Sequence, residues 1–240
     1  PALKLLRTGE AKIKKEKQNR EELLKQLVIY GQKLAGLGFV IGGSGNISVR
    51  YGRAMLIKAS GILLEEADKH GFVEVGIFAS KKKGTLLPSS EYQLHREIYK
   101  ARPDIHAVVH AHPVFATALA CTNNKSLTYL GSELHLVLGS ELGQVPYFSP
   151  GSGELARHAA AQMQCCNGVL LQNHGAVSVG KTLKEAFFRM RVIEHTIKVY
   201  LFANLFAKGN MKKLHLLSKK QIQQVVETEM GAYRQRFVQG

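Results

Sequence analysis

The sequence of 240 residues has few of the features that mark membrane, secreted or disulfide-stabilised proteins. No apolar run approaches the roughly 18 residues that a helix needs to cross a bilayer. The first 20 residues are basic and polar and lack the apolar centre of a secretory signal, so the expected location is the cytoplasm. Three cysteines are too few for a disulfide framework, and the adjacent Cys165 and Cys166 are poorly spaced for a bridge. We therefore expect reduced thiols within the core.

Acidic residues are also scarce, because 18 Asp and Glu stand against 33 Lys and Arg and leave a net charge of +15. Such an excess is typical of nucleic-acid-binding proteins, but here it is concentrated at the two ends. Residues 1–33 carry nine basic and four acidic groups, and residues 208–240 carry seven and two. We expect one domain over residues 1–240 with basic terminal extensions at 1–20 and 205–240. This distribution favours attraction of an anionic small molecule over binding to nucleic acid or membrane.

Neither an internal repeat nor a low-complexity linker divides the chain, and hydrophobic periodicity predicts both strands and helices. Helices are expected over residues 21–35, from 88–91 to 102 with a serine as N-cap, over 114–120, from a capping box at 182–185 to about 204, and over 218–230. Strands are expected over residues 47–50, 54–59, 73–79, 107–110, 168–171 and 176–179, with a loop at 81–84. Strands separated by helices, with hairpins present, predict a layered α/β fold.

His110 and His112 stand two residues apart at the end of an apolar strand. Side chains two apart on a strand share a face, so both imidazoles can reach one metal ion, although each could also make a separate hydrogen bond. His174 favours the metal, because its turn between two apolar strands gives an imidazole little packing reason to be there. Three imidazoles leave an open coordination position and suit Zn²⁺, or Mn²⁺ or Co²⁺, better than Mg²⁺ or Ca²⁺. Of the other histidines, only His106 is placed to lie behind such a metal.

Glu91 opens a predicted helix, where the helix dipole favours a carboxylate; it is either a capping residue or a metal ligand and base. Ser89 and Ser90 precede it and are either N-caps or part of a phosphate cradle built with the free N–H groups of the helix start. Glycines in two further turns would let backbone N–H groups approach an anion, although each turn alone reads as a plain turn. These turns are residues 43–46, with Gly45 and Asn46, and residues 59–61, with Ser60 and Gly61.

Five short motifs follow one another along the chain: GNISVR at 45–50, ASG at 59–61, PSSE at 88–91, RPDIHAVVHAH at 102–112 and LQNHG at 171–175. In this order they resemble the class II aldolase/adducin family, most closely its branch of L-fuculose-phosphate aldolases, over about residues 21–200. The resemblance implies a single-domain α/β/α layered fold with a central, mostly antiparallel sheet. It also implies a homotetramer with its sites at subunit contacts.

The resemblance further implies roles for the residues of the site. Zn²⁺ would be bound by His110, His112 and His174, with Glu91 as a ligand in the resting enzyme and as acid/base during turnover. The phosphate of the substrate would be bound by Gly45, Asn46, Ser60, Gly61, Ser89 and Ser90. The implied activity is that of an aldehyde-lyase, which cleaves a ketose 1-phosphate such as L-fuculose 1-phosphate into dihydroxyacetone phosphate and an aldehyde.

The chain departs from the family pattern at the aldehyde end of the site. Family aldolases protonate the departing aldehyde with a tyrosine that follows the His-x-His segment, whereas Tyr129 here lies out of register; Glu133 and Tyr233 are the other candidate acids. The aromatic residue expected near Pro150 is missing. A methylthioribulose-phosphate dehydratase or a decarboxylase on the same metal centre therefore stays open, while Glu91 in place of Asp argues against the ribulose-phosphate 4-epimerase branch. A non-catalytic adducin-like binding module is disfavoured, because that branch has lost the metal ligands.

Overall fold

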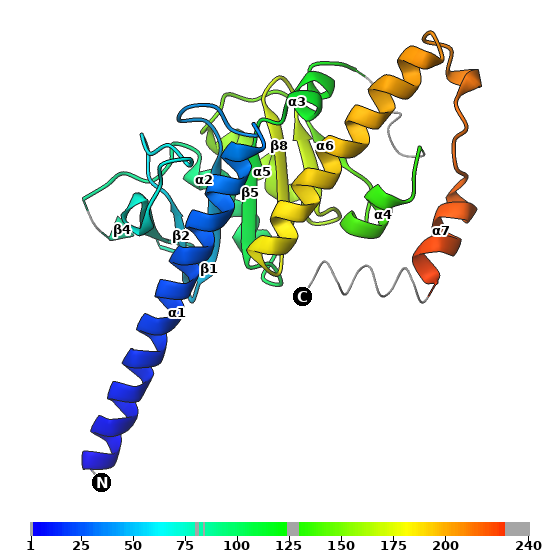
Figure 1. The fold of residues 1–240 in the computed structure, drawn as a ribbon. Coiled ribbons are helices and arrows are strands. Elements are labelled where there is room, and N and C mark those ends of the chain that lie inside the picture. Colours follow the sequence, from blue (N-terminus) through cyan, green and yellow to red (C-terminus); the bar gives the residue numbers. More distant parts are fainter. Residues whose placement is uncertain (1, 80–81, 84, 124–129, 229–240) are drawn as a thin grey trace.

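The computed structural model describes residues 2–79, 82–83, 85–123 and 130–228, with side chains from residue 19 onward except those of 82–83 and 211. Eight strands in this part of the chain form one sheet in the order β4-β3-β2-β1-β5-β8-β7-β6. Every pair of neighbours is antiparallel except β6 and β7, which are parallel. Helices lie against this sheet (Figure 1), so the predicted α/β class with a mostly antiparallel sheet is confirmed.

Most strands fall where alternation of apolar and polar residues predicts them. They are β1 (Asn46–Tyr51), β2 (Ala54–Lys58), β3 (Phe72–Gly76), β4 (Lys82–Lys83), β5 (Ala107–Ala111), β6 (Gly143–Val145), β7 (Gly168–Leu171) and β8 (Gly175–Gly180). The expected third strand is too long, because β3 ends at Gly76, and part of the expected loop forms β4 against it. The sequence does not predict β6, because this strand has three residues and pairs in parallel with β7, so no hairpin turn marks it.

The helices are α1 (Ala2–Gly36), α2 (Tyr92–Ala101), α3 (Val114–Ala120), α4 (Glu133–Leu138), α5 (Gly153–Gln162), α6 (Leu183–Phe206) and α7 (Lys219–Glu227), with short 3₁₀ helices η1 (Lys69–Gly71) and η3 (Met211–Lys213). α1 begins well before residue 21, so the basic N-terminal extension continues a helix (Figure 1). α4 and α5 were not expected. In the described part of the chain no helix is both long and apolar enough to span a membrane.

Alternation along the strands divides the core into two layers, one on each face of the sheet. On β5, Val109 packs with residues of α1, α3, α4 and α6, whereas Val108 packs with residues of α2 and α5. On β7, Leu170 and Val169 divide in the same way. Successive side chains of a strand point to opposite faces, so both layers are built on one sheet. The α/β/α layering follows, and it is the basis on which we propose one domain for the chain.

Local hydrogen bonds correct two predicted N-terminal caps. Residue Glu91 holds the N-cap position of α2 without a capping side-chain bond, and Ser89 Oγ instead accepts from the Glu91 N–H at 3.3 Å. At α6, Thr182 accepts from the Glu185 N–H as expected, but the Glu185 carboxylate accepts from the Lys181 N–H rather than closing the box on Thr182. Glu185 also pairs with Arg189 one turn on, and this pairing competes with the box.

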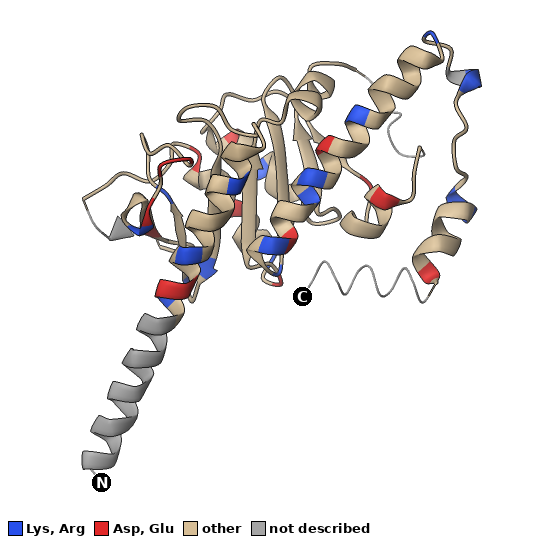
Figure 2. Cartoon of the chain, in the orientation of Figure 1, with Lys and Arg blue, Asp and Glu red and all other residues tan. Residues whose placement is uncertain are grey.

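The cysteines and the charged residues of α6 differ in their exposure. All three cysteines are free thiols, but only Cys166 is buried, so the expectation that all three lie in the core is wrong for Cys121 and Cys165. Basic and acidic side chains alternate along α6, as Figure 2 shows: Lys184, Glu185, Arg189, Arg191, Glu194 and Lys198. Lys184, Arg191 and Lys198 are exposed, whereas Glu185, Arg189 and Glu194 are buried, so the charged side chains that α6 presents to solvent are basic.

Candidate metal centre

Three imidazoles converge at one end of the sheet. His110 and His112 come from the end of β5, and His174 comes from the turn that leads into β8, the strand paired with β5. One ligand nitrogen from each of the three lies within 4.8 Å of the others, and the ring centroids are 4.8–5.1 Å apart. Among the described residues, these three form the one group of His, Cys, Asp or Glu side chains in which at least three ligand atoms lie close enough to share a cation.

The backbone of the turn explains how three rings approach so closely. Asn173 adopts a left-handed conformation with φ of 54°, which asparagine tolerates better than most residues. A Cβ atom on Gly175 would lie 2.6 Å from Ala111 O and 2.6 Å from His112 Cδ2. Only glycine lets the turn pack against the His112 ring, so the Asn-His-Gly sequence is needed to bring His174 to the end of β5.

The hydrogen bonding of His110 directs a lone pair toward the other rings. Its Nδ1 lies 3.0 Å from Ala176 O, a carbonyl that can only accept, so Nδ1 carries the proton. In the neutral ring Nε2 is then unprotonated, and it lies 3.1 Å from His112 Nε2. A backbone carbonyl that fixes the tautomer in this way is a recurrent support of metal-binding histidines.

Glu91 faces the imidazoles from the N-terminus of α2. Its Oε2 lies 2.8 Å from His110 Nε2, and its Oε1 lies 3.5 Å from His174 Nε2. Burial would raise the pKa of Glu91, but His110, His174 and the Asn46 amide outweigh burial and hold that pKa well below its usual range. Burial would likewise lower the pKa of His110, yet the adjacent carboxylate raises it. Without a cation the two groups therefore form a buried ion pair.

The remaining polar atoms of this cluster are not satisfied by the protein. Glu91 Oε1 and His174 Nδ1 are buried and make no hydrogen bond to any described residue. The 3.5 Å approach of His174 to Oε1 is an electrostatic contact that lacks hydrogen-bond geometry. Burial and the neighbouring imidazoles lower the pKa of His112 to about 3, and burial with the His110 charge lowers that of His174 to about 4. Two neutral imidazoles beside an ionised carboxylate with a spare oxygen fit a divalent cation.

A buried chain of hydrogen bonds supports Glu91 from behind. The Asn46 amide donates to Glu91 Oε2 at 3.3 Å, and its carbonyl oxygen accepts from His95 Nε2. His95 Nδ1 lies 2.7 Å from Ser48 Oγ, which lies 2.9 Å from the Tyr99 hydroxyl. Burial lowers the pKa of His95 to about 3, so the neutral ring can donate at Nε2 and accept at Nδ1. The chain thereby fixes the amide orientation that presents N–H to the carboxylate.

Sequence reasoning assigned no role to His95, although one signal was available. His95 and Tyr99 are four residues apart, on the same buried side of α2 as Leu94 and Ile98. A histidine that is fully buried on an apolar helix face needs polar partners there. For His106 the expectation is wrong. This residue is exposed at the far end of β5 and does not lie behind the three imidazoles.

The predicted phosphate-binding residues lie in turns that meet beside Glu91. Ala59 bridges to Pro88, and the Ser60 N–H donates to Leu87 O at 2.8 Å, so the second turn lies against the one that holds the serines. The Gly45 turn enters β1, and a Cβ there, at φ of +67°, would clash with Val40 at 2.4 Å. Exposure differs among the members: Ser60, Gly61 and Ser90 are exposed, and Gly45, Asn46 and Ser89 are buried.

The candidate acids for the aldehyde are less well defined. Tyr129 and Tyr233 lie outside the described residues. Glu133 is exposed in the first turn of α4 and does not belong to the convergent group of histidines. The assignment of this acid therefore stays a prediction.

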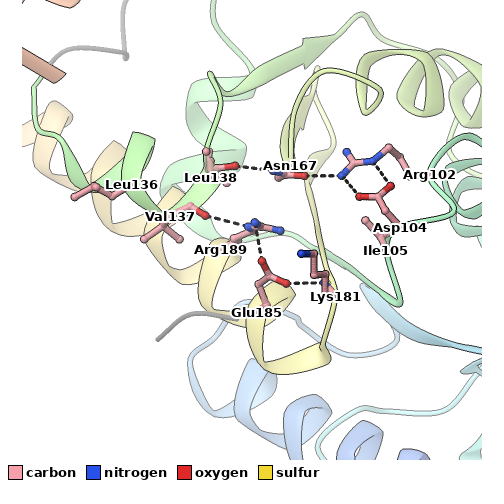
Figure 3. A pocket seen from close by; sticks show the side chains of 11 residues that line it. Arg102, Asp104, Ile105, Leu136, Val137, Leu138, Asn167, Lys181, Glu185 and Arg189 are labelled. Carbon is pink, nitrogen blue, oxygen red and sulfur yellow. Dashed lines mark hydrogen bonds and ion pairs between the residues drawn. The ribbon is translucent and has the colours of Figure 1, made fainter. Parts of the chain in front are cut away.

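A second polar cluster lies at the other end of β5 and β8, around a cavity of about 320 Å³ (Figure 3). Arg102 binds Asp104 through two N–H···O bonds of 2.8 and 2.7 Å and also donates to Met163 O. Arg189 pairs with Glu185 at 2.7 Å and donates to Val137 O and Val179 O. Four of the charged groups that line this cavity, Arg102, Asp104, Glu185 and Arg189, are thus paired within the protein, which is typical of a structural cluster. The Lys181 ammonium also lines the cavity and forms no ion pair with a described residue.

Comparisons with known proteins match most of the chain. The family model for the "Class II Aldolase and Adducin N-terminal domain" matches residues 25–201. An L-fuculose phosphate aldolase of Methanocaldococcus jannaschii is 33% identical over 184 residues, 77% of this chain and 98% of the relative. A 5-methylthioribulose-1-phosphate/5-deoxyribulose-1-phosphate aldolase of Rhodospirillum rubrum is 32% identical over 182 residues, 76% of this chain and 81% of the relative. A solved L-fuculose 1-phosphate aldolase superposes with a TM-score of 0.76 at 32% identity, covering 86% of this chain and 95% of that structure.

Proposed function

This chain belongs to the class II aldolase and adducin family and is an enzyme of the metal-dependent aldolase class, and we propose that it cleaves a ketose 1-phosphate by a retro-aldol reaction. The products are dihydroxyacetone phosphate and an aldehyde, with L-fuculose 1-phosphate as the first substrate to test. One observation carries the proposal: three imidazoles and the Glu91 carboxylate converge and leave buried polar atoms without a protein partner. An adducin-like binding module has no use for such a site.

Zinc is the proposed cofactor, held by His110, His112 and His174 with Glu91, and Mn²⁺ and Co²⁺ are the alternatives. Imidazole nitrogens suit these ions better than the hard cations Mg²⁺ and Ca²⁺. When bound, the cation supplies Lewis-acid polarisation of the substrate's oxygens and stabilises the negative charge that bond cleavage leaves behind. The remaining work is done by side chains of the protein.

Glu91 is the proposed base. Its carboxylate takes the proton of the C4 hydroxyl, the C4 oxygen becomes the aldehyde carbonyl, and the C3–C4 bond breaks with its electron pair left on the dihydroxyacetone phosphate part. A proton must then be returned to C3 of that product. Protonated Glu91 can return the proton to C3, so the step balances, and Tyr129, Glu133 and Tyr233 are the proposed candidates for the acid that acts on the aldehyde. Asn46 and His95 hold Glu91 in place during these steps.

The phosphate is proposed to lie against Gly45, Asn46, Ser60, Gly61, Ser89 and Ser90. Support comes from the contact between the Ser60–Gly61 turn and the segment that carries Ser89 and Ser90. Both lie beside the N-terminus of α2, where free N–H groups and the helix dipole favour an anion. A phosphate fixed there would orient the reacting carbons relative to Glu91.

A homotetramer in the cytoplasm completes the proposal. Large apolar side chains are exposed near the metal centre and at the end of α6: Ile41, Val114 and Phe206 are 77%, 62% and 86% exposed. Val114 follows His112 by two residues, so a subunit contact here would adjoin the site. The free thiols are in keeping with a reducing compartment.

A second class of substrate is favoured by one observation. The Rhodospirillum rubrum relative, which matches as well as the fuculose-phosphate aldolases do, is named for 5-methylthioribulose 1-phosphate and 5-deoxyribulose 1-phosphate. These are also ketose 1-phosphates, so the same carboxylate and phosphate turns would serve. A dehydratase or a decarboxylase on the same metal centre is the alternative reaction.

The test is a product assay on zinc-loaded protein with L-fuculose 1-phosphate, 5-deoxyribulose 1-phosphate and 5-methylthioribulose 1-phosphate. We expect dihydroxyacetone phosphate from at least one of them, abolished by a chelator and restored by zinc. The matched control is His106→Ala, which removes a histidine outside the cluster and should retain activity. Stoichiometric zinc with no dihydroxyacetone phosphate from any of the three would contradict the aldolase proposal, and loss of water or CO₂ would then identify the alternative.

A further inference from the structure

The short helix α3 connects two of the three histidines of the candidate metal centre. It begins directly after Pro113, whose ring holds φ at −60° and leaves little freedom in the link to His112. At the other end of α3, the carbonyl of Ala120 accepts from the N–H of Asn173 at 3.1 Å, directly before His174. The position of α3 therefore affects His112 through the chain and His174 through a hydrogen bond.

A carboxylate from another helix holds the start of α3. Glu194 lies on α6, which packs against α3 (Figure 1), and is 8% exposed. Its Oε1 accepts from the Phe115 N–H at 3.0 Å, and its Oε2 accepts from the Ala116 N–H at 2.8 Å. These N–H groups belong to the first turn of α3 and have no acceptor within that helix. Pro113, at the N-cap position, has no side-chain oxygen that could accept from them.

The negative charge of Glu194 is balanced only by these N–H groups. No ion pair of the described residues involves Glu194, and Lys198, one turn further along α6, lies instead over the Phe115 ring at 5.3 Å from its centroid. Burial of a carboxylate is unfavourable unless it is hydrogen-bonded. An uncharged cap next to the helix would satisfy one N–H with less desolvation, whereas Glu194 fixes two from 78 positions further along the chain. The arrangement favours a firmly held helix start over a simply capped one.

We propose that Glu194 is a positioning residue for the metal centre, and that it holds α3 where His112 and His174 can bind one cation together. The inference rests on the proposed zinc site. Glu194 is not a member of the convergent group of ligands, so it acts through the backbone of α3. Binding of zinc favours the arrangement in which the imidazoles converge, and by the same coupling it must strengthen the two hydrogen bonds of Glu194.

The experiment compares the wild-type full chain with Glu194→Gln. Glutamine keeps the shape of the side chain but has one acceptor oxygen, and its NH₂ group faces a backbone N–H, so the start of α3 should move. Competition with a chelator should give a zinc dissociation constant about 10- to 100-fold weaker, the range found when the support of a metal ligand is lost. The visible absorption spectrum of bound Co²⁺ should also change, because it reports the geometry of the ligands.

Thr182→Ala is the matched control, because it removes another side-chain acceptor from a helix start, at the other end of α6. Both variants should unfold at lower urea concentration than the wild type in chelator. Only Glu194→Gln should change the zinc affinity and the Co²⁺ spectrum. A folded Glu194→Gln with zinc affinity within about twofold of the wild type and the same Co²⁺ spectrum would overturn the proposal and leave Glu194 as a helix cap.

Kinetics separate this inference from the proposed aldolase activity. At saturating zinc, kcat of Glu194→Gln should fall by about 10-fold while KM stays within about twofold, because the ligands are displaced and the phosphate turns are untouched. If zinc affinity changes as expected but neither protein cleaves any of the three ketoses, only the aldolase proposal fails. If the wild type cleaves one of them and Glu194→Gln binds zinc equally well, only the role of Glu194 fails.

Hydrogen exchange in the wild type decides the matter if Glu194→Gln does not fold. Zinc should slow the exchange of the Phe115, Ala116 and Asn173 amides by at least about 10-fold relative to protein in chelator, because the metal and these hydrogen bonds support one another. The Glu185 amide, which is bound to Thr182, is the internal control and should be slowed less. Equal exchange of the Phe115 and Ala116 amides with and without zinc would overturn the inference.

Discussion

Strands β5 and β8 carry a polar cluster at each end, and the two clusters differ in how completely their buried polar atoms are bonded. At the metal-centre end, formed by His110, His112, His174 and Glu91, like groups face one another and two buried atoms have no hydrogen-bond partner. At the arginine end, formed by Arg102, Asp104, Glu185 and Arg189, each charge is paired and each guanidinium donates to backbone carbonyls (Figure 3).

The difference separates a site from a structural cluster. Unpaired buried polar groups cost free energy, so a protein retains them where a ligand completes them. A cavity of about 320 Å³ lies at the arginine end, yet the two guanidinium groups and two carboxylates of that end are paired with one another. Incomplete satisfaction, not the presence of a cavity, therefore marks the functional end of the sheet.

The largest effect should come from His174→Ala. Removing one of three imidazoles should abolish stoichiometric zinc binding and reduce kcat/KM by at least about 1,000-fold, equivalent to about 4 kcal/mol of transition-state stabilisation. Stability without metal should change by less than about 1 kcal/mol, because His174 Nδ1 makes no bond that is lost. Zinc content and urea unfolding in chelator measure both. A variant that still holds zinc and turns over would remove His174 from the site.

Glu91→Gln should separate metal binding from chemistry at the same end. The amide keeps the shape of the side chain, so the three imidazoles should still hold zinc, while loss of the base should lower kcat by about 100- to 1,000-fold. Steady-state kinetics at saturating zinc check this, with zinc content as the control. Wild-type kcat in this variant would make Glu91 a structural residue and weaken the contrast between the two ends.

Arg189→Met should give the opposite pattern at the arginine end. Loss of the guanidinium leaves Glu185 buried without its partner, so the free energy of unfolding should fall by about 3 kcal/mol. Activity per folded molecule and zinc affinity should be unchanged. Chemical denaturation measures the free energy of unfolding, and active-site titration on the same preparation measures the activity per folded molecule. A selective loss of kcat would show that the arginine end takes part in the reaction.

Acidification should affect the two ends unequally, and this is the smallest effect. Three buried imidazoles have folded-state pKa values below the ordinary 6.5, namely His95 and His112 at about 3 and His174 at about 4. The unfolded chain binds their protons first, so they destabilise the fold as pH falls below 6.5; His110, with its raised pKa, opposes this. Metal-free protein should lose about 1–3 kcal/mol between pH 6.5 and 5.0.

The arginine end should not contribute to that loss, because Arg102 holds the pKa of Asp104 below its ordinary value of 3.8. Urea unfolding at both pH values in chelator measures the difference, with Arg102→Met as the comparison. If the loss disappears in Arg102→Met but persists in His174→Ala, the titrating groups lie at the arginine end, and the prediction is wrong.

Local patterns explain why part of this arrangement was predictable. The two-residue period of a strand predicts that His110 and His112 share one face. Asn173 and Gly175, which tolerate positive φ, predict the turn that carries His174. The fold class followed from alternating strands and helices. α4, α5 and β6 escaped prediction because short elements with mixed composition have weak periodicity, and β6 gains its partner only through parallel pairing with β7.

The sequence by itself predicted the layered α/β class, the three histidines and the carboxylate from local patterns: the periodicity of strands and helices, the His-x-His pair, the Asn-His-Gly turn and the start of a helix. Only the tertiary structure decided which oxygen of Glu91 meets which imidazole, and that His95 and Tyr99 stand behind Asn46. These contacts link residues far apart in the chain: Glu91 lies 19 positions from His110 and 83 positions from His174. Burial and partnership at such separations depend on how the strands and helices pack, which no local pattern encodes.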